Sequence, residues 1–163
     1  MQNRVNPFGE IFETPARGLW MGNRGYIHNE HREIIRPYKL KAWITCRLEF
    51  KGRKREIMAA NRYTELFFFD EATAFAAGHR PCCECRRDDY NTFKKVWLKG
   101  NPEYKFNYKT SIREIDEILQ AERINKDGSK KTYKESNKNL PDGTFITISN
   151  QAYLLCNQFL FLW

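Results

Sequence analysis

The sequence predicts an α+β fold with mixed, mostly antiparallel strands and about three helices. Strand-like segments that alternate or are rich in aromatic residues are interspersed with short helical segments. Glycine and proline punctuate the first third of the chain, which is typical of short strands joined by turns. The length of 163 residues suits a single domain spanning 1–163, and an apolar fraction of 41% supplies its core.

The first predicted strand with a clear pattern is KAWITCRLEF, residues 41–50. Ile44, Cys46, Leu48 and Phe50 point to one side, which indicates a half-buried strand. KGRK then forms a turn and REIM, residues 55–58, begins a return strand, so a hairpin is expected. Its tip would carry a compact group of cations: Lys51, Arg53, Lys54 and Arg55.

The next segments predict a strand and three helices. YTELFFF, residues 63–69, favours a strand, and Asp70 can cap a helix over 71–77 that ends at Gly78. A second helix is expected over 89–99, with an apolar face of Tyr90, Phe93, Val96 and Trp97. A third is expected over 111–124, where Ser111 and Glu114 have capping-box spacing.

The composition of the chain changes after residue 124. Residues 125–140 are polar and lysine-rich, which indicates a loop with nothing to bury. PDG then turns the chain into TFITI, AYLLC and FLFLW, which predict a β meander over 141–163.

The chain is basic, with a formal net charge of +8 and a pI near 9.3. Ten Lys or Arg residues fall between residues 32 and 62, against Glu33, Glu49 and Glu56. This balance favours an anionic partner, and nucleic acid is the commonest one. A solvated, charged surface is the plainer interpretation of the same residues.

The cellular compartment decides whether cysteines are expected to form disulfides. The start lacks an apolar leader and no apolar run is long enough to span a bilayer, so the expected location is cytoplasmic, with no membrane partner. Disulfides are rare there. Five cysteines, three of them within residues 82–85, therefore indicate a metal site or reactive thiols.

Cys82 and Cys85 form a C-x-x-C pair, which is half of a tetrahedral zinc site. Cys46 is the natural third ligand if its strand packs beside this knuckle. The fourth is open among His79, Cys83, His28 and His31. The expected cofactor is Zn2+, with strands and helices arranged around a zinc-knuckle module. Alternatively no metal is bound, because free cysteine also packs as a small apolar side chain.

The stretch FFFDEATAFAAGHRPCCECRRDD resembles the zinc-binding domain of the Ada DNA-repair family, and WITCR resembles the strand there that carries the first cysteine. The resemblance covers about residues 42–90. It implies a zinc-stabilised α/β module that contacts DNA, with ligand roles for Cys46, Cys82 and Cys85. The Ada pattern has a second cysteine soon after the first, where this chain reads RLEF. The whole chain also resembles a set of small bacterial proteins with an RGLWMGNRG opening and an LPDG turn.

The predicted function is a zinc-stabilised nucleic-acid-binding protein, with DNA preferred. The expected contacts are the four cations of the hairpin tip with Arg86 and Arg87, and Lys94 and Lys95 could extend that surface along the second helix.

Two alternatives remain open. One is an enzyme acting on nucleic acid, as an alkyl-accepting thiolate or a metal-assisted hydrolase with His28 as the base. The other is a protein-interaction module. Arg17 and Arg24 flank glycines and could hold a phosphate, and Asp116, Glu117 and Glu122 could hold a divalent ion.

Overall fold

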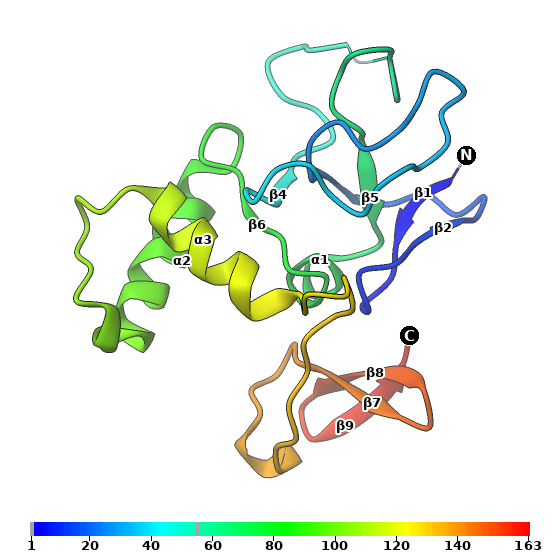
Figure 1. Ribbon diagram of the computed structural model, residues 1–163. Coiled ribbons are helices and arrows are strands. Elements are labelled where there is room, and N and C mark those ends of the chain that lie inside the picture. The colour runs from blue at the N-terminus through cyan, green and yellow to red at the C-terminus, as the bar shows by residue number, and fades with distance from the viewer. Residues whose placement is uncertain (1, 55) are drawn as a thin grey trace.

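The computed structural model describes residues 2–54 and 56–163, and it has the α+β fold that the sequence predicts (Figure 1). The described chain contains three α-helices, a mixed six-stranded sheet and a three-stranded antiparallel sheet. Helices α2 and α3 lie together on one side of the larger sheet, and the smaller sheet lies below α1 in the view of Figure 1.

The six-stranded sheet is built from short strands in the order β2-β1-β5-β3-β4-β6. Three of its neighbouring pairs are antiparallel, whereas β1–β5 and β4–β6 are parallel. The strands are β1 (Gln2–Val5), β2 (Ile11–Glu13), β3 (Trp20–Asn23), β4 (Ile44–Cys46), β5 (Leu66–Phe68) and β6 (Arg80–Pro81). The predicted series of short N-terminal strands is therefore confirmed.

The prediction of a hairpin over residues 41–58 is wrong. β4 ends at Cys46, and its neighbours are β3 and β6 rather than the segment that follows the KGRK turn. Lys51 and Met58 have left-handed backbone angles, with φ of 52° and 54°. A left-handed residue cannot continue a strand, so the described part of this segment is a series of turns.

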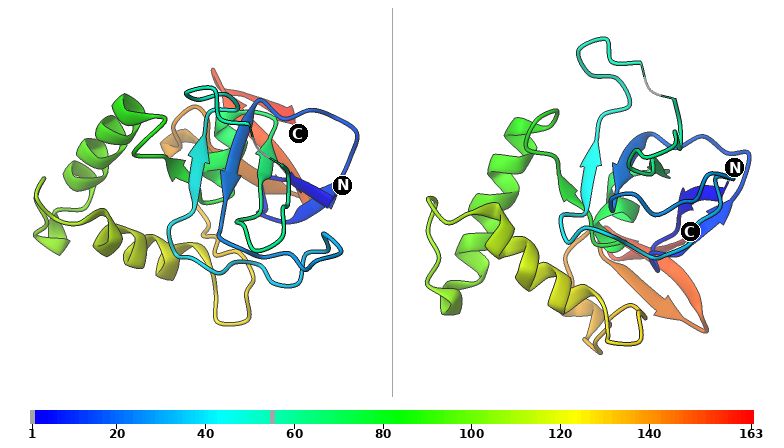
Figure 2. Two further views of the ribbon diagram at one scale, coloured as in Figure 1. Left: turned by 90° about the horizontal axis from the view of Figure 1, so that it is seen from above. Right: turned by 45° about the horizontal axis from the view of Figure 1, so that its top comes forward.

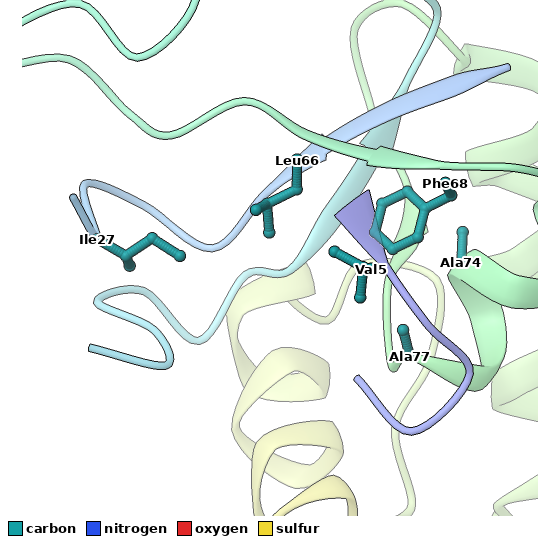
Figure 3. Packing of buried hydrophobic residues seen from close by; sticks show 6 residues of the cluster. All are labelled: Val5, Ile27, Leu66, Phe68, Ala74 and Ala77. Atoms are coloured by element: carbon teal, nitrogen blue, oxygen red, sulfur yellow. The ribbon is translucent and has the colours of Figure 1, made fainter. Parts of the chain in front are cut away.

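Helix α1 (Glu71–Ala76) covers the main hydrophobic core. Figure 3 shows Val5 and Phe68 lying against Ala74 and Ala77, with Leu66 and Ile27 farther along the same core. All six side chains are at most 2% exposed. The small alanines let α1 approach the sheet closely, which explains the alanine-rich sequence of this helix.

Replacing Asp70 with alanine should destabilise the protein by about 1 kcal/mol. The Asp70 carboxylate accepts a hydrogen bond of 2.6 Å from the Thr73 backbone N–H, which otherwise has no partner within the first turn. Denaturant unfolding of Asp70→Ala and Asp70→Asn would measure the cost. The asparagine variant keeps an acceptor oxygen, so it should stay near the wild type; equal losses for both variants would contradict the capping role.

Helices α2 (Arg87–Gly100) and α3 (Ile112–Arg123) are joined by a short 3-10 turn, Pro102–Tyr104. The predicted capping box of α3 is confirmed in both directions. The predicted apolar face of α2 is only partly correct, because Val96 is 63% exposed while Lys94 is buried. Among residues 2–54 and 56–163, no helix combines the length and apolarity that a membrane crossing requires.

The smaller sheet contains β7 (Phe145–Ile148), β8 (Gln151–Cys156) and β9 (Phe159–Leu162), in that order and antiparallel. A second 3-10 turn, Asn137–Asn139, precedes it. Figure 2 shows this sheet beside α1 and the strands β1 and β2. The Trp163 indole N–H, just after β9, donates to the Thr73 hydroxyl at 3.0 Å, and its ring stacks on Phe69, so the sheet is anchored to α1 and to the residue that follows β5.

Candidate metal centre

Parallel pairing of β4 with β6 brings two distant cysteines together. The register aligns Thr45 with Pro81, so Cys46, the last residue of β4, and Cys82, which follows β6, lie side by side. The Cys82 N–H also donates to the Thr45 carbonyl at 2.9 Å. The expected packing of the Cys46 strand beside the C-x-x-C turn is thus what the structure shows.

A tight turn after β6 adds the third sulfur. The Arg86 N–H donates to the Cys82 carbonyl at 3.1 Å, which closes the turn, and the Glu84 N–H points at the Cys82 sulfur at 3.4 Å. Cys46, Cys82 and Cys85 are each buried, and their Sγ atoms all lie within 4.8 Å of one another. Three thiols therefore converge on one point.

The three thiols have divergent acidities. The pKa of Cys82 falls to about 5, chiefly because the Cys46 thiol donates a hydrogen bond to its sulfur, with backbone N–H groups of Cys85 and Glu84 adding to the effect. Donating that hydrogen bond raises the pKa of Cys46, and burial raises that of Cys85. The arrangement thus stabilises one thiolate, and a divalent cation would displace the remaining two protons.

The donor set fits zinc. Zn–S bonds of about 2.3 Å place the sulfurs of a tetrahedral site about 3.8 Å apart, so the triad needs only a small contraction. Met21, Ile44 and Phe67 surround the sulfurs. This apolar shell favours a soft, thiolate-bound ion over one that prefers oxygen and water.

The structure does not bring the candidate fourth ligands into this cluster. Within the described residues, the group of convergent ligand atoms consists of the three cysteines. His79 lies elsewhere: its Nε2 accepts a hydrogen bond from Arg24 Nε at 3.3 Å, and its ring packs against Trp43 and Phe68. Cys83 is exposed on the knuckle.

The two remaining histidines differ in environment. His31 is exposed, as a polar turn predicts. His28 is fully buried, with Nδ1 2.6 Å from the Thr64 hydroxyl and Nε2 3.3 Å from the Ala59 carbonyl. Because a carbonyl can only accept, Nε2 carries the proton and Nδ1 accepts from Thr64. Both nitrogens of this candidate base therefore have partners.

The predicted nucleic-acid contacts separate into two groups. Lys51, Arg53, Lys54 and Arg87 are exposed, and Arg55 lies outside the described residues. Arg86 is only 3% exposed. It is bound by the carboxylates of Glu71 and Asp89 and by the Thr45 hydroxyl, and it lies over the Trp20 ring. Arg86 is therefore a structural residue that links the knuckle to β4, rather than a surface cation.

Two other predicted surfaces are corrected in the same way. Lys94 is buried, and its ammonium donates to the carbonyls of Tyr108 and Thr110 at 2.8 and 2.6 Å. Asp116 is also buried, with both oxygens bound by the Arg80 guanidinium. Glu117 instead pairs with Lys41 on the surface, so these helix carboxylates do not form a divalent-ion site.

No protein-family model, no curated protein and no solved structure matches this chain.

Proposed function

We propose that this protein is a zinc-stabilised nucleic-acid-binding protein, with DNA as the preferred nucleic acid. The observation that carries the proposal is the buried convergence of Cys46, Cys82 and Cys85. These three residues would hold the ion, with the fourth position open to a group from outside the cluster. A bound zinc would supply a cross-link between β4 and the knuckle and would contribute directly to folding.

The same cross-link would orient an exposed basic loop, residues 47–54. Phe50 packs against the cysteine cluster, so the loop begins on the metal site. Arg53 pairs with Glu84 inside the C-x-x-C turn, with one N–O distance of 3.1 Å, and its guanidinium lies over the Phe50 ring. These contacts fix the position of the loop, and its Lys51 and Lys54 side chains are exposed to solvent.

Charge supports an anionic polymer as the partner. The chain carries a net charge of +8, and the basic loop adds its cations to two exposed residues of α2, Arg87 at its start and Lys95 in its middle. Lys and Arg neutralise phosphates and give affinity that does not depend on sequence. The resemblance of residues 42–90 to the Ada-type zinc domain supports DNA over RNA.

Burial supports a structural role for the metal. Cys46, Cys82 and Cys85 are 6–7% exposed, which leaves little access for an alkylated base or phosphotriester. The His28 side chain is fully buried, and both ring nitrogens contact protein groups, which leaves no access for a substrate. Binding is accordingly the function that the site supports best.

Reversing two charges on the basic loop should weaken DNA binding. In Lys51→Glu/Lys54→Glu, we expect at least a tenfold loss of affinity for a short duplex, because about two phosphate contacts are lost. The slope of log K against log salt should become shallower by about two. Fluorescence anisotropy across a salt series would measure both quantities.

Lys126→Glu/Lys138→Glu is the matched control, since both lysines are exposed and the charge change is the same. That variant should keep most of the affinity and the wild-type slope. Equal losses in both double variants would show that net charge alone governs binding. A wild type that binds no nucleic acid at low salt would refute the proposed function, while leaving the metal site intact.

A further inference from the structure

A second cluster of cations, separate from the cysteines, lies where the chain leaves β3 and where α3 ends. Arg24 follows β3 and is 2% exposed. The guanidinium carbons of Arg24 and Arg123 lie 4.1 and 4.8 Å from the centre of the Trp43 ring. Lys130 joins them from the loop after α3. These three side chains, which we call the Arg24 cluster, place up to three positive charges around one site.

Two donors of this cluster lack partners. Arg24 Nε donates to His79 Nε2, and Arg123 donates from Nε to the Leu119 carbonyl and from Nη1 to the Gly78 carbonyl. Among the described residues, however, neither Arg24 Nη2 nor Arg123 Nη2 has a hydrogen-bond partner, and both atoms are buried. A buried guanidinium donor without a partner is costly, so each such atom calls for an acceptor.

The nearby carboxylates already have other partners. Asp116 is held by Arg80 through two hydrogen bonds of 2.7 Å. Glu10 borders the same region, and its carboxylate accepts from the Asn6 side chain at 2.8 Å. Glu122 accepts from the Tyr104 hydroxyl at 3.3 Å. Within residues 2–54 and 56–163, none of the ion pairs involves Arg24, Arg123 or Lys130.

The Arg24 cluster lines a small cavity that adjoins a larger cleft. The cavity has a volume of about 60 Å³ and is bordered by all three cations. The cleft has a volume of about 690 Å³ and shares Arg24 and Lys130 with the cavity. Arg36 adds a further cation to the cleft. A cleft of this volume falls in the usual range for small-molecule sites, roughly 300–1,000 Å³.

We propose that the Arg24 cluster binds the phosphate group of a small ligand, either inorganic phosphate or a phosphate monoester whose remainder lies in the cleft. Two guanidinium groups with unpartnered donors and one ammonium border the same cavity, and together they match the several acceptor oxygens of a phosphate. The cavity has room for such a head group and not for a polymer backbone. This site is separate from the cysteine cluster and does not depend on the proposed DNA binding.

The acidity of these groups agrees with a missing counter-ion. Burial lowers the pKa of Arg24 to about 9 and that of Arg123 to about 10, and burial with the neighbouring guanidiniums lowers the pKa of Lys130 to about 8. A bound dianion would oppose each of these shifts.

Titration calorimetry and thermal unfolding with inorganic phosphate test the proposal, with chloride at matched ionic strength as the reference. We expect one phosphate per chain and a Tm that rises with phosphate beyond any effect of chloride. Arg24→Met and Lys130→Met should each weaken phosphate binding by about tenfold or more. Arg113→Met, which removes an exposed charge from α3, should leave binding unchanged.

A wild type that responds to phosphate only as it does to chloride would overturn the proposal, as would wild-type affinity in the two cluster variants. If Arg24→Met fails to fold, Lys130→Met decides alone, since Lys130 is only half-buried.

A sugar monophosphate and the same sugar without phosphate separate the two sources. Tighter binding of the monoester than of inorganic phosphate identifies an organic ligand, and equal binding identifies phosphate itself. Binding of the unphosphorylated sugar with the same affinity as its monophosphate would refute phosphate recognition.

Discussion

Substituting Cys85 with serine is expected to abolish zinc binding and to lower Tm by more than about 10 °C. Wild-type protein purified without added metal should contain close to one zinc per chain, measured by elemental analysis, and the variant close to none. Loss of a structural metal is among the few changes that cost about 4–5 kcal/mol or more. In a protein of this size each kcal/mol shifts Tm by about 2–4 °C.

The size of the effect follows from what the metal would join. Cys46 ends β4, whereas Cys82 and Cys85 belong to the turn between β6 and α2. Without the ion, one thiolate and two thiols remain in an apolar shell formed by Met21, Ile44 and Phe67. The edge of the sheet would then depend on the short β4–β6 pairing and on the contacts of Arg80 and Arg86.

Cys83→Ser is the matched control, because Cys83 is exposed on the same knuckle and lies outside the cluster. It should retain zinc and the wild-type Tm. Chelator treatment should destabilise the wild type and Cys83→Ser alike, and leave Cys85→Ser unchanged. The cysteines would be only core residues if the purified wild-type protein contained no metal and if chelator did not change its Tm.

Local patterns predicted the elements that depend on local chemistry. The cap at Asp70 and the capping box at Ser111 and Glu114 each involve residues three apart, so the sequence alone locates those helix starts. The convergence of Cys46 with the C-x-x-C turn was also predicted, from the alternating strand that carries Cys46 and from the resemblance of residues 42–90 to the Ada-type zinc domain.

The hairpin prediction failed because alternation does not limit the length of a strand. Residues 47–50 continue the pattern of β4, yet Phe50 folds back onto the cysteine cluster and the chain turns at Lys51. The left-handed backbone of Met58 could not be predicted from the sequence, because glycine and asparagine are the residues that usually adopt such angles.

Buried charge was the other feature that the sequence could not reveal. Arg86 sits beside Arg87 in the sequence, but only Arg86 faces Glu71 and Thr45, which are distant along the chain. Similarly, Arg24 was identified as a candidate phosphate ligand from its flanking glycines, whereas Arg123 and Lys130 lie in a helix and a polar loop that carry no such signal. Partners of this kind become visible only in three dimensions.

Substituting Asp116 with alanine is expected to destabilise the protein by about 3–5 kcal/mol. Arg80 Nε and Nη2 donate to the two carboxylate oxygens at 2.7 Å each, and the side chains are only 5% and 4% exposed. The pair joins β6 to α3. Removing the carboxylate leaves a guanidinium charge buried without its counter-ion, which costs more than the lost hydrogen bonds.

The exposed pair of Lys41 and Glu117 offers the matched comparison, since it joins the chain to the same helix one residue away. Its side chains are 53% and 59% exposed. Glu117→Ala should cost less than about 1 kcal/mol, because water and salt screen a surface ion pair. Urea unfolding of the two variants in parallel would measure the difference.

Adding Arg80→Met to Asp116→Ala should recover part of the lost stability, because the uncompensated charge then disappears while the apolar contacts of the stem are kept. Since Arg80 lies two residues before Cys82, the single Asp116→Ala variant should also loosen the knuckle and bind zinc less tightly than the double variant. If Asp116→Ala is no more destabilised than Glu117→Ala, the Arg80–Asp116 pair does not hold β6 against α3. The cysteine knuckle would then owe its position to the β4–β6 pairing, to Arg86 and to the proposed metal ion.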